Sequence, residues 1–487
     1  MIFRKYNFLK VIKVAMTVCC FPVLWGNNLI VSNPALVNQN VLQDYTMIKF
    51  NVSWNNSWKV STGPANWDAA WIFIKYRIQG QTEWRHATLN YADGTGSGDG
   101  HTEPSGCNIS SSDDNGSGGA YGVFIHAAAA LAQSNVAYNN IQLRWNYGVD
   151  GLADNAKVEV CLFGIEMVYV PQGSFFVGSG GSEDGAFYEY PTTTTPYHVL
   201  SENPLNVGNV TGDFNYTSSG DNLGPVPAAF PKGFKAFYCM KYEISQAQYA
   251  AFLNKLNNTQ ATARYTATPN FRNGISGFPG SYSSSNPYVA ANYLNWADVA
   301  AFLDWACLRP LTELEYEKAA RGTLSPNPNE FAWSSASITQ AIAINNPGSS
   351  DENVLASNAN CNYGNHPNVQ GPVRVGCFGQ GINTRVGTGS GYYGIMELSG
   401  NTFERTVSVG NPTGRNFSGL HGDGLIDASG DANVINWPDA SGTGMGFRGG
   451  SWNQPANLLR ISDRFYALNA NGDRQGDYGG RGCRTAP

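Results

Sequence analysis

The last third of the chain, residues 323–487, has almost no helical periodicity. Short apolar runs in it alternate with turns rich in glycine, asparagine and proline. A stretch of this length with so little regular structure is uncommon inside a compact domain. We therefore expect strong internal bonding, from a metal ion or from aromatic side chains, to replace the missing helices and strands.

The composition indicates an exported globular protein. Hydrophobic residues make up 42% and aromatic residues 13% of the chain, which excludes a disordered protein, whereas charged residues are only 14%, well below the roughly 25% of an average globular chain. The formal net charge is −6, and no cluster of Lys or Arg follows the first residues. Because nucleic-acid binding needs such a basic cluster, we expect no nucleic-acid partner.

The N-terminal residues 1–27 have the features of a signal peptide. Basic residues precede an apolar stretch at residues 14–25, and this stretch is too short to cross a membrane. We therefore expect a secreted protein without a membrane span, located in the periplasm, at the cell surface or outside the cell.

Seven of the nine cysteines follow this leader. Their odd number and the lack of a C-x-x-C pair argue against a full disulfide framework and against a zinc site. Cys239 and Cys307 lie in apolar segments and are predicted to be buried thiols. Cys361 and Cys377 are the best candidates for a single disulfide, which would close a polar loop.

Residues 36–163 are predicted to form an antiparallel β-sandwich. In the segment 45–54, Ile48, Phe50 and Val52 alternate with polar residues, so their side chains share one face of a strand. No helical period interrupts the region, and glycine-rich turns separate its apolar segments, which is typical of a sandwich. Further strands are predicted at residues 70–78, 84–89, 123–126, 141–147 and 157–163.

Three helices are predicted in the second unit, residues 165–487. Helical spacing of apolar residues indicates two of them, at residues 245–256 and 297–306. The third begins after Thr312, whose hydroxyl can accept a hydrogen bond from the Glu315 amide while the glutamate side chain reaches back to the threonine amide. A long polar stretch before these helices is predicted to be a loop with little regular structure.

Five sequence blocks of the second unit occur in a known order. They lie at residues 167–175, 242–249, 309–322, 394–404 (G-I-M-E-L-S-G-N-T-F-E) and 447–452 (F-R-G-G-S-W). Together they resemble the formylglycine-generating enzyme family, also called the sulfatase-modifying factor family. The resemblance implies an α+β fold: a C-type-lectin-like domain with few helices and much irregular structure, preceded here by the all-β sandwich.

The resemblance also carries an expectation about catalysis. Oxidases of the family have two cysteines just beyond R-G-G-S, which hold copper, and soft thiolate ligands are what select Cu(I). Those places fall near Gln454 and Leu459 here, and amide or alkyl groups cannot replace thiolates. The related iron-dependent sulfoxide synthases need a histidine cluster, and the six histidines of this chain show no ligand spacing. We expect no copper and assign no catalytic residue.

A calcium site is the cofactor expectation that remains. Family members hold Ca²⁺ with the asparagine and glutamate of the G-N-x-x-E segment, which correspond to Asn401 and Glu404, and oxygen ligands suit this hard cation. Thr402 could add its backbone carbonyl. The alternative is structural, with Asn401 capping a turn and Glu404 paired with an arginine, and both interpretations stay open.

The residues after R-G-G-S-W mix Asn, Tyr, Phe, Asp and Ser and close on G-C-R. This segment resembles the variable region of retroelement-diversified lectin-fold proteins, although Arg481 stands where such proteins usually have phenylalanine. The resemblance implies that certain residues hold the loop, namely Arg448, Arg460, Ser462, Asp463 and Arg464. The mixture of aromatic and adaptable polar side chains between them is typical of a protein-binding surface. The predicted ligand-binding residues are Asn453, Gln454, Asn457, Leu458, Phe465, Tyr466, Asn469, Asn471, Gln475, Asp477 and Tyr478.

Three functions follow from these observations. The preferred one is a secreted, non-catalytic ligand-binding or display protein whose C-terminal face binds a protein or a glycan. One alternative is a structural subunit of a cell-envelope or extracellular assembly that packs against copies of itself. The other is an oxidoreductase of the same family with altered chemistry.

Overall fold

The computed structural model describes residues 28–95, 98–354, 358–379 and 384–487. The predicted signal peptide lies outside these residues. Among the helices of the described part, none is both long enough and apolar enough to cross a membrane.

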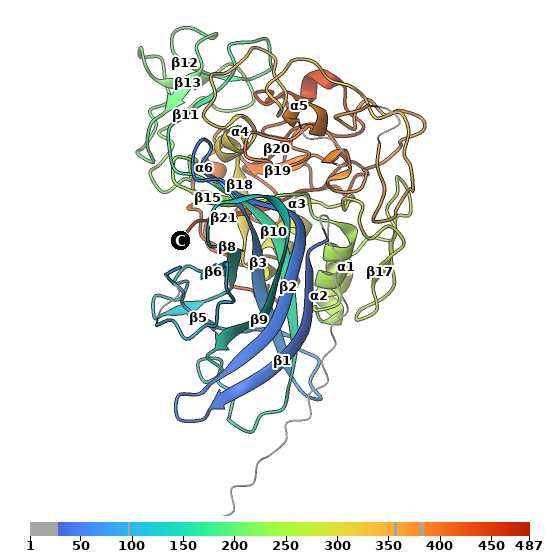
Figure 1. Ribbon diagram of the computed structural model, residues 1–487. Coiled ribbons are helices and arrows are strands. Elements are labelled where there is room, and N and C mark those ends of the chain that lie inside the picture. Colours follow the sequence, from blue (N-terminus) through green and yellow to red (C-terminus); the bar gives the residue numbers. More distant parts are fainter. Residues whose placement is uncertain (1–27, 96–97, 355–357, 380–383) are drawn as a thin grey trace, which may run out of the picture.

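A five-stranded antiparallel sheet forms one layer of the N-terminal region (Figure 1). Its strand order is β1 (Ile30–Asn40), β2 (Tyr45–Lys59), β9 (Leu131–Trp145), β5 (Leu89–Asn90) and β7 (Gly119–Ala120). Ile48, Phe50 and Val52 of β2 are at most 1% exposed, so the predicted alternation is confirmed. Strand β1 was not predicted, because its sequence shows no regular alternation and its residues are mostly half-buried.

The other sheet has ten strands and runs through both predicted units. Its order is β20 (Met445–Arg448), β19 (Glu404–Val407), β18 (Arg309–Thr312), β21 (Gly482–Thr485), β15 (Phe237–Met240), β10 (Val158–Val170), β3 (Asp68–Ile78), β8 (Val123–Ala127) and β6 (Cys107–Ser110), with β4 (Arg85–His86) beside β3. The predicted boundary at residues 163–165 falls inside β10, which pairs with β3 on one side and with β15 on the other. The division into two units stays a prediction.

The two faces of strand β3 contribute to different cores. Ile72 and Ile74 face the five-stranded sheet and pack in the sandwich core with residues such as Phe50 and Leu143. This packing confirms the sheet-rich N-terminal region.

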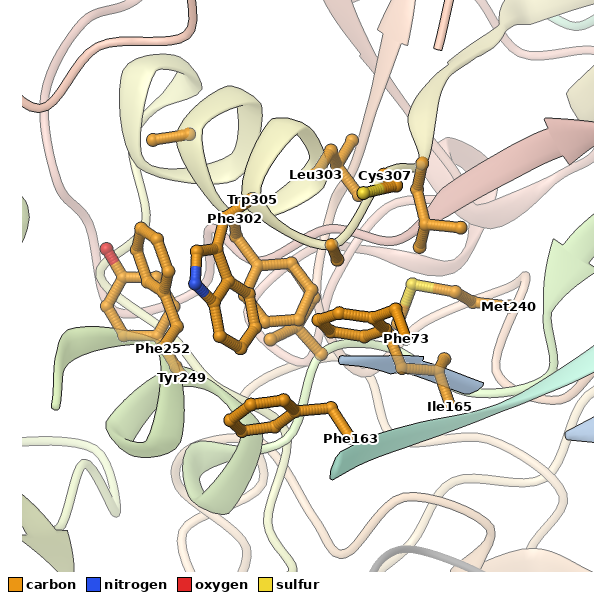
Figure 2. Packing of buried hydrophobic residues seen from close by; sticks show 14 of the residues in the cluster. Phe73, Phe163, Ile165, Met240, Tyr249, Phe252, Phe302, Leu303, Trp305 and Cys307 are labelled. Atoms are coloured by element: carbon orange, nitrogen blue, oxygen red, sulfur yellow. The ribbon is translucent and has the colours of Figure 1, made fainter. Parts of the chain in front are cut away.

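Phe73 points to the other face and meets the helices of the second unit, as Figure 2 shows. Its ring lies 5.1 Å from Trp305 of α3 (Trp296–Trp305), and Phe163 of β10 lies 4.8 Å from the same indole. The sandwich therefore shares a hydrophobic core with the helices.

All three predicted helices are present. Each begins with a capping box, at Ser245 for α1 (Gln246–Leu253), at Asn295 for α3 and at Thr312 for α4 (Glu313–Arg321). The structure adds α2 (Asn258–Arg264), whose polar sequence lacks an apolar stripe. It also adds single turns α5 (Arg385–Thr388) and α6 (Pro412–Arg415).

The predicted polar loop also contains short strands. The small sheets of the second unit pair β11 (Phe175–Val177) with β13 (Tyr197–Val199), β12 (Phe187–Glu189) with β14 (Phe214–Tyr216), and β16 (Ile275–Ser276) with β17 (Ser283–Ser284).

The cysteines of the described residues are buried thiols. Cys239 and Cys307 are therefore confirmed as buried thiols. The predicted disulfide between Cys361 and Cys377 is wrong, because the two side chains belong to different core clusters. The Cys361 thiol instead donates a hydrogen bond to the Ser399 carbonyl over 3.0 Å.

Candidate functional site

Buried ion pairs attach the C-terminal coil to helix α4. The Glu313 carboxylate accepts hydrogen bonds from Arg448 over 3.2 Å and from Arg464 over 2.7 Å. Glu317, one turn further along α4, accepts from Arg448 over 2.7 Å and from Arg321 over 3.0 Å. All five side chains have no exposed surface. Burial alone would raise the pKa of Glu313, but the guanidinium groups of Arg464 and Arg448 outweigh it and lower this pKa.

The residues predicted to hold the loop do so. Besides the two arginines, the Ser462 hydroxyl donates to Glu317 over 3.1 Å, and the Asp463 carboxylate accepts from the Phe465 amide over 3.1 Å. Arg460 donates to the Asn329 side chain over 2.8 Å. Ion pairs and hydrogen bonds thus stabilise the coil, in addition to the aromatic contacts that the sequence led us to expect.

Nine of the predicted ligand-binding residues reach the surface to some extent. Phe465 is 51% exposed, and its ring lies edge-to-face against Tyr466 at 4.7 Å. We call the exposed members the C-terminal face: Asn453, Asn457, Phe465 and Gln475. The half-buried members are Gln454, Leu458, Tyr466, Asn469 and Asn471.

Asp477 and Tyr478 are corrections to the predicted set, because they are only 4% and 7% exposed. The Asp477 carboxylate accepts from the Ser451 hydroxyl over 2.9 Å, and burial raises its pKa. The Tyr478 ring packs against Phe447 at 4.5 Å and against the Arg405 guanidinium at 5.0 Å. Both side chains are buried and contact other residues of the protein, so they stabilise the coil and are not available to a ligand.

The positions that correspond to the oxidase cysteines have structural surroundings. Leu459 is fully buried, in a core cluster with Leu398 and Ile461. Gln454 is half-buried, and its backbone carbonyl accepts from the Gly364 amide over 2.9 Å. Neither the alkyl group of Leu459 nor the carboxamide of Gln454 ionises near neutral pH, so neither gives an anionic ligand like a thiolate.

The predicted calcium ligands bond to other protein groups. Asn401 donates to the Glu243 carboxylate over 2.5 Å and accepts from the Val373 amide over 2.8 Å. The Thr402 amide and hydroxyl both donate to Glu243, over 2.7 and 2.8 Å.

Glu404 accepts from Arg481 over 2.5 Å. Arg481 supplies the positive charge beside Glu404. The structure thus supports the arginine-pair interpretation for Glu404, and the calcium site stays a prediction. The role of Glu243 was not predicted, although its block was recognised.

Calcium binding can be tested directly by thermal unfolding. Because Asn401 and Glu404 are already paired with protein groups, we expect the same melting temperature in millimolar calcium and in chelator. A ligand that binds only the native state stabilises it by about 2.7 kcal/mol at a hundredfold excess over its dissociation constant. A calcium-dependent rise in melting temperature that Glu404→Ala removes would instead establish the site implied by the family resemblance.

Comparison with known proteins gave a family match and a weak structural likeness. The profile of the family described as sulfatase-modifying factor enzyme 1-like domain matches residues 163–486. Among solved structures, Treponema denticola variable protein 1 is similar at 14% sequence identity and a TM-score of 0.34, over 66% of this chain and 96% of that chain. The comparison with curated proteins gave no match.

Proposed function

This chain belongs to the sulfatase-modifying factor enzyme 1-like family, and we propose that it is a secreted, non-catalytic binding protein that uses the family scaffold to present its C-terminal face. One observation carries the proposal. The exposed side chains of this face belong to a coil that buried Arg–Glu pairs fix to α4. A binding surface that is already ordered loses little conformational entropy when its ligand docks.

The chemistry of the face suits a protein or a glycan ligand. Phe465 offers an exposed aromatic ring. Its backbone is fixed by two hydrogen bonds: its amide donates to the Asp463 carboxylate, and its carbonyl accepts from the Ser219 hydroxyl over 3.3 Å. The other exposed members lie before and after Phe465 in the chain: Asn453, Asn457 and Gln475. Their side-chain amides can both donate and accept hydrogen bonds. Rigid aromatic anchors among adaptable polar groups are typical of binding surfaces.

Export is the second part of the proposal. The basic and apolar pattern of residues 1–27 supports a secretory leader. The low charged fraction of 14% agrees with a protein that works outside the cytoplasm. Screening the purified protein against an array of immobilised glycans and extracellular proteins tests the binding function, and we expect selective binding to a few members.

The purified protein, with or without added Cu(I), is expected to leave the cysteine of a sulfatase-type peptide unchanged. The reason is that Gln454 and Leu459 supply no thiolate to hold copper or to engage the substrate thiol. Mass spectrometry of the peptide measures conversion to formylglycine, with an active family oxidase as positive control. Copper-dependent product above the no-protein level would contradict the non-catalytic assignment.

A further inference from the structure

A polar groove of about 850 Å³ lies where the β-sandwich meets the second unit. We call it the junction groove. Strand β2 and the following turn supply one wall, including Asn56, Trp58 and Asn66; the other wall includes Tyr242, Tyr392 and Tyr393. Its volume falls in the range of about 300–1,000 Å³ common for small-molecule sites. The described lining includes no residue of the C-terminal face.

We propose that the junction groove binds a neutral oligosaccharide. The proposal concerns a second site and does not depend on ligand binding at the C-terminal face.

Aromatic rings in the groove provide surfaces on which a sugar ring can stack. Trp58, Tyr242 and Tyr392 are half-buried, so part of each side chain is open to the groove that it lines. The face of an aromatic ring is electronegative. The C–H groups of a sugar ring, which carry a small positive charge, can therefore stack on such a surface.

Polar but uncharged side chains in the groove provide hydrogen-bond donors and acceptors for the hydroxyl groups of a sugar. Side-chain amides line the sandwich side of the groove at Asn66 and Gln133, and hydroxyl groups line the opposite side at Thr384, Thr388 and Ser390. Amides and hydroxyls each provide donors and acceptors, as the hydroxyl groups of a sugar require. The Asn66 amide also donates to the Tyr393 carbonyl over 2.7 Å, which ties the two walls together.

Each of the three cations in the described lining of the groove, Lys241, Arg374 and Arg385, already has a protein acceptor, which favours a neutral ligand over an anion. Lys241 lies 3.2 Å from the Glu166 carboxylate and 3.7 Å from that of Asp68. Arg385 donates to the backbone carbonyls of Ala320 and Ala332 over 2.9 and 2.5 Å. An anionic ligand would have to compete with these acceptors.

Titration calorimetry with maltotriose, cellotriose and chitotriose tests the proposal, with 3′-sialyllactose as the anionic comparison. We expect the wild-type protein to bind at least one of the neutral trisaccharides. Trp58→Ala should weaken that binding, because the sugar ring loses one of its stacking surfaces. Tyr392→Ala should remove detectable binding.

Phe465→Ala is the matched control and should leave trisaccharide binding unchanged, since this residue lies on the C-terminal face. A failure of the C-terminal face to bind a ligand would therefore not affect this test. The proposal is overturned if no neutral trisaccharide binds at millimolar concentration, if only sialyllactose binds, or if Trp58→Ala and Tyr392→Ala bind as tightly as the wild-type protein.

Discussion

Replacing Glu313 by alanine is expected to lower the free energy of unfolding by about 3–5 kcal/mol, the usual cost of removing one partner from a buried ion pair. Glu313 has no exposed side-chain surface and bonds to both Arg448 and Arg464. It also accepts hydrogen bonds from the Ser408 hydroxyl and the Val409 amide, over 3.0 and 2.8 Å. The substitution removes one acceptor from each of these donors, although Arg448 keeps Glu317 and Arg464 keeps the Gly185 carbonyl. Urea unfolding followed by tryptophan fluorescence measures the loss.

Glu83→Ala is the matched control, because its partner Arg85 lies on the surface and the two side chains are 42% and 69% exposed. Such surface pairs contribute about 0–1 kcal/mol. The pKa of Glu313 is lowered in the folded protein, so its stabilisation is present above the unfolded pKa and is lost as the pH falls through the folded pKa. The difference between wild type and Glu313→Ala should therefore shrink in acid. A Glu313→Ala loss no larger than that of Glu83→Ala would contradict the role of the ion pairs.

Trp452→Ala is expected to lower the free energy of unfolding by about 3–5 kcal/mol through the cavity it leaves. The side chain is 1% exposed, and its ring lies 5.0 Å from Phe271. The indole also donates to the Gly476 carbonyl over 2.9 Å, which fastens one part of the C-terminal coil to another. Calorimetric melting measures the effect.

Phe465→Ala provides the comparison for Trp452→Ala. With 51% of its residue surface exposed, Phe465 should change the free energy of unfolding by no more than about 0.5 kcal/mol. Equal destabilisation by the two substitutions would show that Phe465 belongs to the core, and it would remove the aromatic anchor from the C-terminal face.

Local patterns of the sequence were sufficient for much of the fold. The alternation at Ile48, Phe50 and Val52 predicted β2 because only one face of that strand is buried. The capping box at Thr312 predicted the start of α4 because its hydrogen bonds join residues three apart. The continuation of the ten-stranded sheet through β10 could not be predicted, because pairing with β15 joins segments far apart in the chain.

The candidate site was only partly predictable for the same reason. The sequence resemblance separated the loop-holding arginines from the residues between them, yet residue type alone does not give exposure. Tyr478 and Phe465 are both aromatic residues of the predicted face, but Tyr478 packs on Phe447 whereas Phe465 is exposed. The pairing of Arg481 with Glu404 likewise depends on a contact between distant segments.

The central claim is that a rigid scaffold presents the C-terminal face to a ligand, and binding by a surface variant tests it most directly. The measurement compares the wild-type protein with a variant in which Asn453, Asn457, Phe465 and Gln475 are all alanine, on the same array of glycans and extracellular proteins, with melting curves for both. We predict that the variant binds at least about 30-fold more weakly, since loss of an interface anchor costs about 2 kcal/mol or more, while its melting temperature stays close to that of the wild type. Equal binding by both proteins, or no binding of the wild-type protein to any array member, would contradict the claim.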